Sequence, residues 1–188
     1  MKKLILIATA LIGSVSLNAQ TYTLDGAHSS LGFIITHLKI SELQGAFKKF
    51  EAKMTSAKAD FSDAVIELTA ETGSVYTGND GRDKHLASAD FFDAEKNPTM
   101  TFKSTSIKKL KGTVYTVVGD FTFHGVTKTV TLEANYKGKT VNRGTDVYVW
   151  KVKGKIKRSD FGIAASMPND AVDDVVNLNA DLEFSKDK

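Results

Sequence analysis

The sequence contains no cysteine, and only two of its 188 residues are proline. Without cysteine the chain has neither disulfide bonds nor thiolate metal ligands. None of the four histidines, His28, His37, His85 and His124, pairs with another at the i, i+4 spacing of a helical zinc motif. The sequence therefore indicates no metal site, and we expect no cofactor.

Motifs for hydrolysis and phosphate binding are absent as well. There is no Gly-x-Ser-x-Gly turn, and the adjacent His28 and Ser29 would point to opposite faces of a strand. The glycine-containing stretch at residues 77–81 lacks the Walker spacing. A net charge of only +3 does not indicate a nucleic-acid partner. These absences favour a binding protein over an enzyme.

The only long apolar run lies at the N-terminus. Two lysines precede an apolar run over residues 4–15, and small and polar residues follow up to Ala19. This three-part pattern is typical of a secretory signal peptide, and the run is too short to span a bilayer. We expect a signal peptide over residues 1–19, with cleavage after Ser16 as the alternative. The remaining residues, 20–188, are predicted to form one soluble periplasmic domain without a membrane span.

Most of this domain alternates between apolar and polar residues with a period of two. Leu31, Phe33 and Ile35 form one such run, and the run over residues 176–184 alternates most regularly. Period two is typical of β-strands that bury one face. Glycine-containing pairs between the runs predict the reversals: Lys111-Gly112, His124-Gly125 and Lys137-Gly138.

Roughly eight strands and no long helix predict a mainly β fold, either an antiparallel barrel or a sandwich. Closing the sheet into a barrel would satisfy its edges. Eight strands enclose just enough space for side chains or for one small ligand. We therefore expect an eight-stranded antiparallel barrel with one short helical insertion.

The insertion covers residues 77–92, where the alternation stops. A short helix is predicted after a glycine-containing turn, with Asp80 as its N-cap. Two interpretations are open. The stretch is either a polar connection whose Arg82 and Asp83 pair on the surface, or a lid over one barrel end whose terminal phenylalanines turn inward.

The polar and aromatic residues of the domain leave similar alternatives open. The polar groups either form a network that ties the insertion to the barrel ends or belong to a site: His28, Arg82, Asp83, His85, Arg158 and Asp160. The aromatic residues either fill the core or line a cavity: Phe33, Phe47, Phe91, Phe102, Phe121, Phe123 and Trp150.

Several motifs, in order and across essentially the whole domain, resemble those of one family. They are Asp25-x-x-His28-Ser29, Gly45-x-Phe47, Thr77-Gly78-Asn79-x-x-Arg82-Asp83-x-His85-Leu86-x-Ser88-x-x-Phe91-Phe92, Pro98-x-x-x-Phe102, Gly119-Asp120, His124-Gly125-Val126-Thr127-Lys128 and Arg158-Ser159-Asp160-Phe161-Gly162. The sequence is similar to the YceI-like, polyisoprenoid-binding proteins of the bacterial periplasm. This resemblance implies a lipocalin-like barrel with a long apolar tunnel for an isoprenoid or fatty-acyl chain, and it implies no reaction.

On this resemblance we predict a lipid carrier, with a possible homodimer as its assembly. The predicted ligand-binding residues are Phe33, Phe47, Arg82, His85, Phe91, Phe92, Phe102, Phe121, Phe123, Trp150, Arg158 and Phe161. Tyr148 and Trp150 are bulkier than the family pattern has at their strand, and both could shorten the tunnel. The competing hypotheses are an enzyme that acts on a lipid tail, with His28 or His85 as acid or base, and a structural module with a filled barrel.

Overall fold

The structure is a computed structural model, and it describes residues 19–187. The predicted signal peptide, residues 1–19, falls outside the described residues except for Ala19. The strands are β1 (Gln20–Leu24), β2 (Ser30–His37), β3 (Ser41–Phe47), β4 (Phe50–Ser56), β5 (Val65–Glu71), β6 (Val75–Tyr76), β7 (Thr99–Lys111), β8 (Val114–Phe123), β9 (Val126–Asn142), β10 (Thr145–Lys157) and β11 (Val172–Lys186). The helical elements are η1 (Thr72–Ser74), α1 (Asp80–Ala87) and η2 (Arg158–Phe161).

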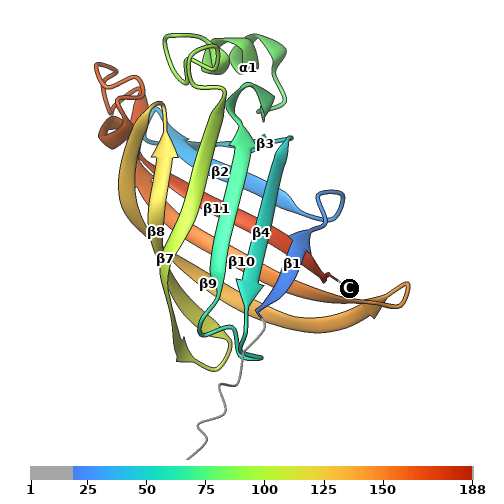
Figure 1. The fold of residues 1–188 in the computed structure, drawn as a ribbon. Helices are drawn as coiled ribbons and strands as arrows, with labels where there is room; N and C mark the ends of the chain where they lie inside the picture. The colour runs from blue at the N-terminus through green and yellow to red at the C-terminus, as the bar shows by residue number, and fades with distance from the viewer. Residues whose placement is uncertain (1–18, 188) are drawn as a thin grey trace, which may run out of the picture.

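Eight of these strands close into a ring in which every neighbour is antiparallel. Around the ring the order is β1-β4-β5-β7-β8-β9-β10-β11, and β11 pairs with β1 to complete it. The smaller strands β2, β3 and β6 continue the sheet from the other half of β11. The predicted eight-stranded antiparallel barrel with one short helical insertion is confirmed, and α1 covers one end of it (Figure 1).

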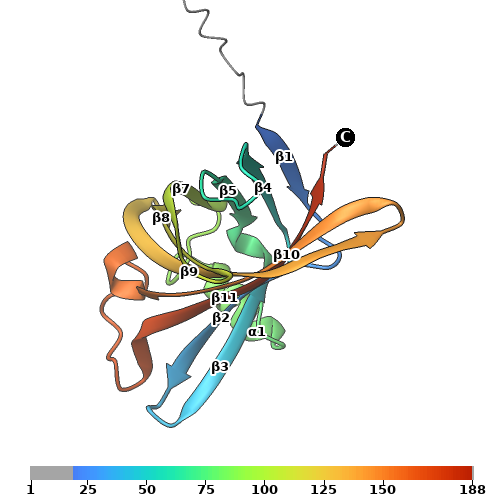
Figure 2. The ribbon, with the colours of Figure 1, turned by 90° about the horizontal axis from the view of Figure 1, so that it is seen from below.

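The first part of the barrel is built from strands that break in the middle. A turn at residues 25–29 separates β1 from β2, and β11 pairs with both of them, β1 near its C-terminus and β2 near its N-terminus. Viewed along the barrel, the β2–β3 hairpin extends beyond the ring of strands (Figure 2). The break lets β1 complete the barrel wall on β11, while β2 pairs with the other half of β11, toward the end that carries α1.

The strand reversals follow the backbone preferences of two-residue hairpins. His124 and Gly125, between β8 and β9, have φ angles of 50° and 73°. Such turns need positive φ at both central residues, which glycine adopts without strain. The predicted reversal at His124-Gly125 is therefore confirmed, since this pair lies between β8 and β9. The reversal predicted at Lys111-Gly112 is confirmed as well, with Lys111 as the last residue of β7 and the turn at Gly112 and Thr113.

The predicted reversal at Lys137-Gly138 is wrong. β9 runs through both residues, and the chain turns later, at Arg143-Gly144. Gly138 pairs with Val149 while the next pair along β10 joins Trp150 to Tyr136, so the strand carries a bulge here. A bulge uses the conformational freedom of glycine as a turn does, but it leaves the strand direction unchanged.

The structure also corrects the start of the predicted helix. Asn79, not Asp80, is the N-cap of α1, and its side chain accepts a hydrogen bond from the backbone nitrogen of Arg82 at 2.9 Å. Both side chains could cap a helix, and the backbone decides between them: Asn79 is extended whereas Asp80 is already helical. No side chain of α1 is buried, so the helix lies on the barrel rather than inside its core.

Candidate ligand-binding cavity

The barrel encloses an apolar cavity of about 470 Å³ at the end that carries α1. Inward-facing side chains of most strands line it, together with α1 and the loop that follows η2. The aliphatic lining includes Leu31, Ile35, Leu43, Met54, Ile66, Leu68, Val117, Val130, Leu132, Val152, Ile163, Val176, Leu178 and Leu182. Small-molecule sites in proteins have volumes of about 300–1,000 Å³ and mostly apolar walls. This cavity falls within that range.

A cluster of aromatic rings forms the floor of the cavity and closes the other end of the barrel. Trp150 lies at its centre, with ring centroids 4.9 Å from Tyr136, 5.3 Å from Tyr115 and 5.4 Å from Phe61. Tyr148 packs edge-on against Phe61 at 5.6 Å. Trp150 lies between the other rings of this cluster and the cavity, whose lining it shares with residues of α1 at the other end.

Three tyrosines of the floor, Tyr22, Tyr136 and Tyr148, remain neutral phenols at physiological pH. Burial is the main cause that raises the pKa of Tyr22, of Tyr136 and of Tyr148 above the usual value. The hydroxyl of Tyr115 donates a hydrogen bond of 2.7 Å to the carbonyl oxygen of Asp60. Uncharged rings, together with a Tyr115 hydroxyl whose hydrogen bond is satisfied, make a floor compatible with an apolar ligand.

Glycines in the wall allow large side chains to lie flat against it. A Cβ atom on Gly119 would lie 2.5 Å from the Phe102 ring, and one on Gly45 would overlap the Phe33 ring. Leu132 covers Gly154 in the same way. The rings of Phe33 and Phe102 both line the cavity.

Phenylalanines gather at the α1 end of the cavity. The ring centroids of Phe47 and Phe92 are 6.0 Å apart, and those of Phe92 and Phe123 are 5.0 Å apart. Phe92 comes from the segment after α1, so the insertion contributes a buried aromatic to the cavity wall. The interpretation of the insertion as a lid with inward-turned aromatics agrees with this arrangement.

The polar groups of α1 are organised around Thr77 at the cavity rim. The Arg82 side chain donates from Nε to the Thr77 hydroxyl at 2.7 Å and from Nη2 to the Thr77 carbonyl at 2.9 Å. Asp83 accepts hydrogen bonds from the backbone nitrogen of Thr77 at 2.8 Å and from its hydroxyl. Both charged residues thus hold the start of the insertion, and the alternative of a direct surface pair between Arg82 and Asp83 is not what the structure shows.

His85 completes the rim on the same helix. Its Nε2 atom lies 3.2 Å from a carboxylate oxygen of Asp90, and its ring packs edge-on against Phe91 with centroids 4.9 Å apart. Its side chain is 58% exposed, so it meets both solvent and the cavity. A polar group at the mouth of an apolar cavity is suited to contact the head group of an inserted chain.

Arg158 borders the cavity but uses its guanidinium to hold a loop. Its side chain is buried, and it donates hydrogen bonds to the carbonyl oxygens of Ile163, Ala164, Met167, Val172 and Asp173 and to the side-chain oxygen of Asn169. These six acceptors engage all three nitrogens of the group, which carries five N–H donors in total. Arg158 therefore fixes residues 163–173 at the mouth and has little capacity left for a head group.

The structure places eleven of the twelve predicted ligand-binding residues on the cavity lining. The exception is Phe161, which is 1% exposed and packs behind Phe121 with ring centroids 5.4 Å apart. Sequence analysis did not include the aliphatic lining in this set, although the inward positions of the alternating runs could have indicated it. The two loop contributors, Ile163 and Met167, lie in an irregular segment that has no such signal.

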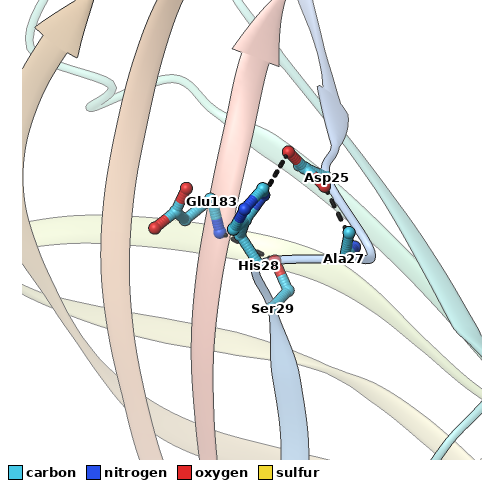
Figure 3. Close-up of polar contacts among 5 residues, drawn as sticks. All are labelled: Asp25, Ala27, His28, Ser29 and Glu183. Carbon is cyan, nitrogen blue, oxygen red and sulfur yellow. Dashed lines mark hydrogen bonds and ion pairs between the residues drawn. The ribbon is translucent and has the colours of Figure 1, made fainter. Parts of the chain in front are cut away.

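The Asp25-x-x-His28-Ser29 motif lies outside the cavity, at the turn between β1 and β2 (Figure 3). His28 Nδ1 is 2.8 Å from an Asp25 carboxylate oxygen, and the Glu183 backbone nitrogen donates to the Ser29 hydroxyl at 2.9 Å. The hydrogen bond between the two side chains raises the pKa of His28 and lowers that of Asp25. The motif therefore ties the broken strand to β11.

Two further findings concern metal ions and membranes. Within residues 19–187, no group of three or more histidine, aspartate and glutamate side chains could hold a metal ion. In the same part of the chain, no helix is long and apolar enough to cross a membrane.

A closed antiparallel barrel with an apolar chamber and a polar rim defines a lipocalin-like binding barrel. A family model described as the YceI-like domain matches residues 22–184. The chain belongs to the YceI-like family, and the resemblance seen in the sequence motifs is confirmed.

Relatives and solved structures extend this assignment. The chain is 40% identical over 177 residues to a UPF0312 protein of Serratia proteamaculans, covering 89% of this chain and 90% of the relative. It is 39% identical over 167 residues to protein YceI of Escherichia coli O6:H1, with 85% of each chain covered.

Among solved structures, BcnA of Burkholderia cenocepacia superposes with a TM-score of 0.76 at 27% identity, covering 85% of this chain and 98% of the other. A Saccharophagus degradans domain described as polyisoprenoid-binding shares the fold, with a TM-score of 0.66 at 16% identity, covering 88% of this chain and 98% of that domain.

Proposed function

We propose that this chain is a non-catalytic carrier that sequesters or transports an isoprenoid, or a related long-chain lipid, in the bacterial periplasm. The observation that carries the proposal is the apolar cavity of about 470 Å³ inside the barrel. A structural module with a filled barrel would have no such space. The description of the Saccharophagus degradans domain supports the ligand class, because a polyisoprenoid-binding domain has the same fold.

The energetics of burial favour recognition of the tail. Each buried methylene contributes about 0.8 kcal/mol, so about ten tail carbons supply roughly 8 kcal/mol before ordering costs are subtracted. Head-group contacts at the rim, worth about 1.5–3 kcal/mol for a charged hydrogen bond, would then set orientation and preference. Arg82 and His85, which line the cavity at the α1 end, are the residues we propose for such contacts.

No arrangement in the described residues favours the enzymatic alternative. His28 lies outside the cavity at an exposed turn, and His85 contacts Asp90 at the rim, where its side chain is 58% exposed. The cavity wall that would contact a tail is mainly aliphatic and phenyl side chains, and its histidines, His37 and His85, lie with the polar residues of its lining. Export rests on the predicted signal peptide of residues 1–19, and the periplasmic location is part of the proposal.

The proposal is tested by extracting the purified protein with organic solvent and identifying released lipids by mass spectrometry. We expect an isoprenoid lipid in the extract and uptake of added polyprenyl lipid by the emptied protein. A blocking variant, Val176→Trp, places a large ring on the cavity lining and should retain little lipid. The control is Val65→Trp, because Val65 is exposed at the start of β5 and does not line the cavity.

An empty extract, combined with no uptake of added polyprenyl lipid, would overturn the proposal. Equal lipid retention by Val176→Trp and Val65→Trp would show that the ligand binds elsewhere.

A further inference from the structure

The tip of the β2–β3 hairpin exposes two large aliphatic side chains. Leu38 is 55% exposed and Ile40 is 88% exposed. The backbone nitrogen of Ile40 donates to the carbonyl of His37 at 3.3 Å, which closes a turn whose central residues, Leu38 and Lys39, have φ angles of 51° and 62°. Turns of this shape favour asparagine and glycine, and a bulky residue at positive φ is strained. The tip thus combines a strained backbone with apolar exposure.

This tip is continuous with the mouth of the cavity. Ile35, His37 and Leu43 of the same hairpin line the cavity, while Leu38 and Ile40 do not. The backbone nitrogen of Leu38 donates to the carbonyl of Ala171 at 3.0 Å, which attaches the tip to the loop held by Arg158. Figure 2 shows the hairpin extending beyond the ring of strands. A flat surface that touches the tip would therefore lie beside the mouth.

We propose that Leu38 and Ile40 insert into the surface of a phospholipid bilayer and hold the cavity mouth against it during lipid transfer. The inference rests on the proposed carrier function, because a long-chain ligand would otherwise cross water between membrane and cavity. Lys39 forms an ion pair with Asp170, so the cation at the tip is compensated. Insertion is therefore driven by apolar burial and should depend little on ionic strength.

A bilayer fits this tip better than a second copy of the chain. A second copy could in principle pair with the edge of β3. On the side away from β2, this strand pairs with β6 only at Ala46 and Phe47, so the rest of its edge has no strand partner within residues 19–187. A stable dimer, however, buries about 800 Å² on each partner, and two side chains on a narrow turn offer much less. Two aliphatic side chains bury less apolar surface than a fatty-acyl anchor, so they give a shallow and reversible contact with a bilayer interface, as a carrier that returns to solution requires.

The test is flotation of the purified chain with phosphatidylcholine vesicles that contain no polyprenyl lipid, at low and at high salt. The double variant Leu38→Ser and Ile40→Ser should lower the vesicle-bound fraction about ten-fold. The matched control is Leu110→Ser and Val141→Ser, at the ends of the β7–β8 and β9–β10 hairpins, where the side chains are 57% and 64% exposed. This control should bind vesicles as the parent chain does.

Retention of preloaded polyprenyl lipid should be the same in all three proteins, which also shows that each is folded. Absence of flotation by the parent chain, or an equal loss in both double variants, would overturn the proposal. A dimer that the tip variant dissociates in size-exclusion chromatography would assign the tip to a second copy and would also overturn it. Flotation needs no bound ligand, so failure of membrane contact is distinguishable from failure of the carrier function.

Discussion

At the scale of single residues, the cavity depends on wall positions where glycine has no side chain. Gly119 lies under Phe102, and a Cβ atom there would also lie 2.5 Å from the carbonyl oxygen of Lys103. A side-chain tip can move away from such a contact, but a backbone carbonyl paired in a sheet cannot move cheaply. Gly119 and Gly45 thus give the rings of Phe102 and Phe33 room against the wall, and these rings line the cavity.

Replacing Gly119 with alanine is therefore expected to destabilise the barrel and to displace the Phe102 ring toward the cavity. We expect a loss of about 1–3 kcal/mol in the free energy of unfolding, measured by urea denaturation, together with a lower lipid capacity. The control is Gly26→Ala, because a Cβ atom there has no neighbour within 4 Å. That variant should change stability by no more than about 0.5 kcal/mol. Equal stability of both variants would contradict this account of the wall.

Among single residues, the inward-facing aromatics could be predicted from the sequence, but the hydrogen-bond partners of Arg158 could not. Alternation put Phe33, Phe102 and Phe121 on inward faces, and the structure places all three on the cavity lining. The partners of Arg158 could not be predicted in the same way. Its acceptors are mainly backbone carbonyls of an irregular loop, and carbonyl positions follow from the folded path of that loop rather than from residue type.

At the scale of elements, the loop over residues 163–173 takes its shape from Arg158. Five of its carbonyl oxygens accept hydrogen bonds from one buried cation, and the loop supplies Ile163 and Met167 to the cavity lining. The charge of Arg158 also acts on the neighbouring carboxylate. Burial alone would raise the pKa of Asp174, but two hydrogen bonds from Ser159 and the nearby Arg158 lower it.

Arg158→Met should leave these carbonyls without donors while keeping much of the side-chain volume. A buried acceptor left without its donor costs about 1–3 kcal/mol, and several carbonyls lose their donor together, so we expect the free energy of unfolding to fall by at least about 3 kcal/mol. Amide hydrogen exchange should accelerate across residues 163–173 more than in the barrel strands. The exposed neighbour Lys157→Met serves as the control and should change stability by less than about 0.5 kcal/mol. Unchanged exchange in the loop would show that Arg158 does not organise it.

Elements differed in how well the sequence predicted them. The alternation over residues 176–184 predicted β11 because its C-terminal half alternates between buried and more exposed positions, with Ala180, Leu182 and Phe184 buried. The pair Lys137-Gly138 was misread because glycine marks both turns and bulges, and the pairing of β9 with β10 decides between them. The break between β1 and β2 depends on the closure of the barrel, which is a long-range property.

At the scale of the whole molecule, the two barrel ends have opposite characters. Packed aromatic rings around Trp150 close one end, while the other holds the cavity beneath α1. A bound tail would replace empty space with dispersion contacts along the aliphatic wall. Such contacts exist only in the folded chain, so a ligand that fills the cavity must stabilise the fold as a unit.

Removal of the lipid is therefore expected to lower the melting temperature, and addition of polyprenyl lipid to restore it. Ligand at 100 times its dissociation constant stabilises the folded state by about 2.7 kcal/mol. For a domain of this size each kcal/mol shifts Tm by about 2–4 °C, which gives a difference of about 5–10 °C in calorimetry. Val176→Trp should melt at the same temperature with and without lipid, because its cavity is blocked. If the parent chain also melted at one temperature under both conditions, the cavity would not be the site that holds the lipid.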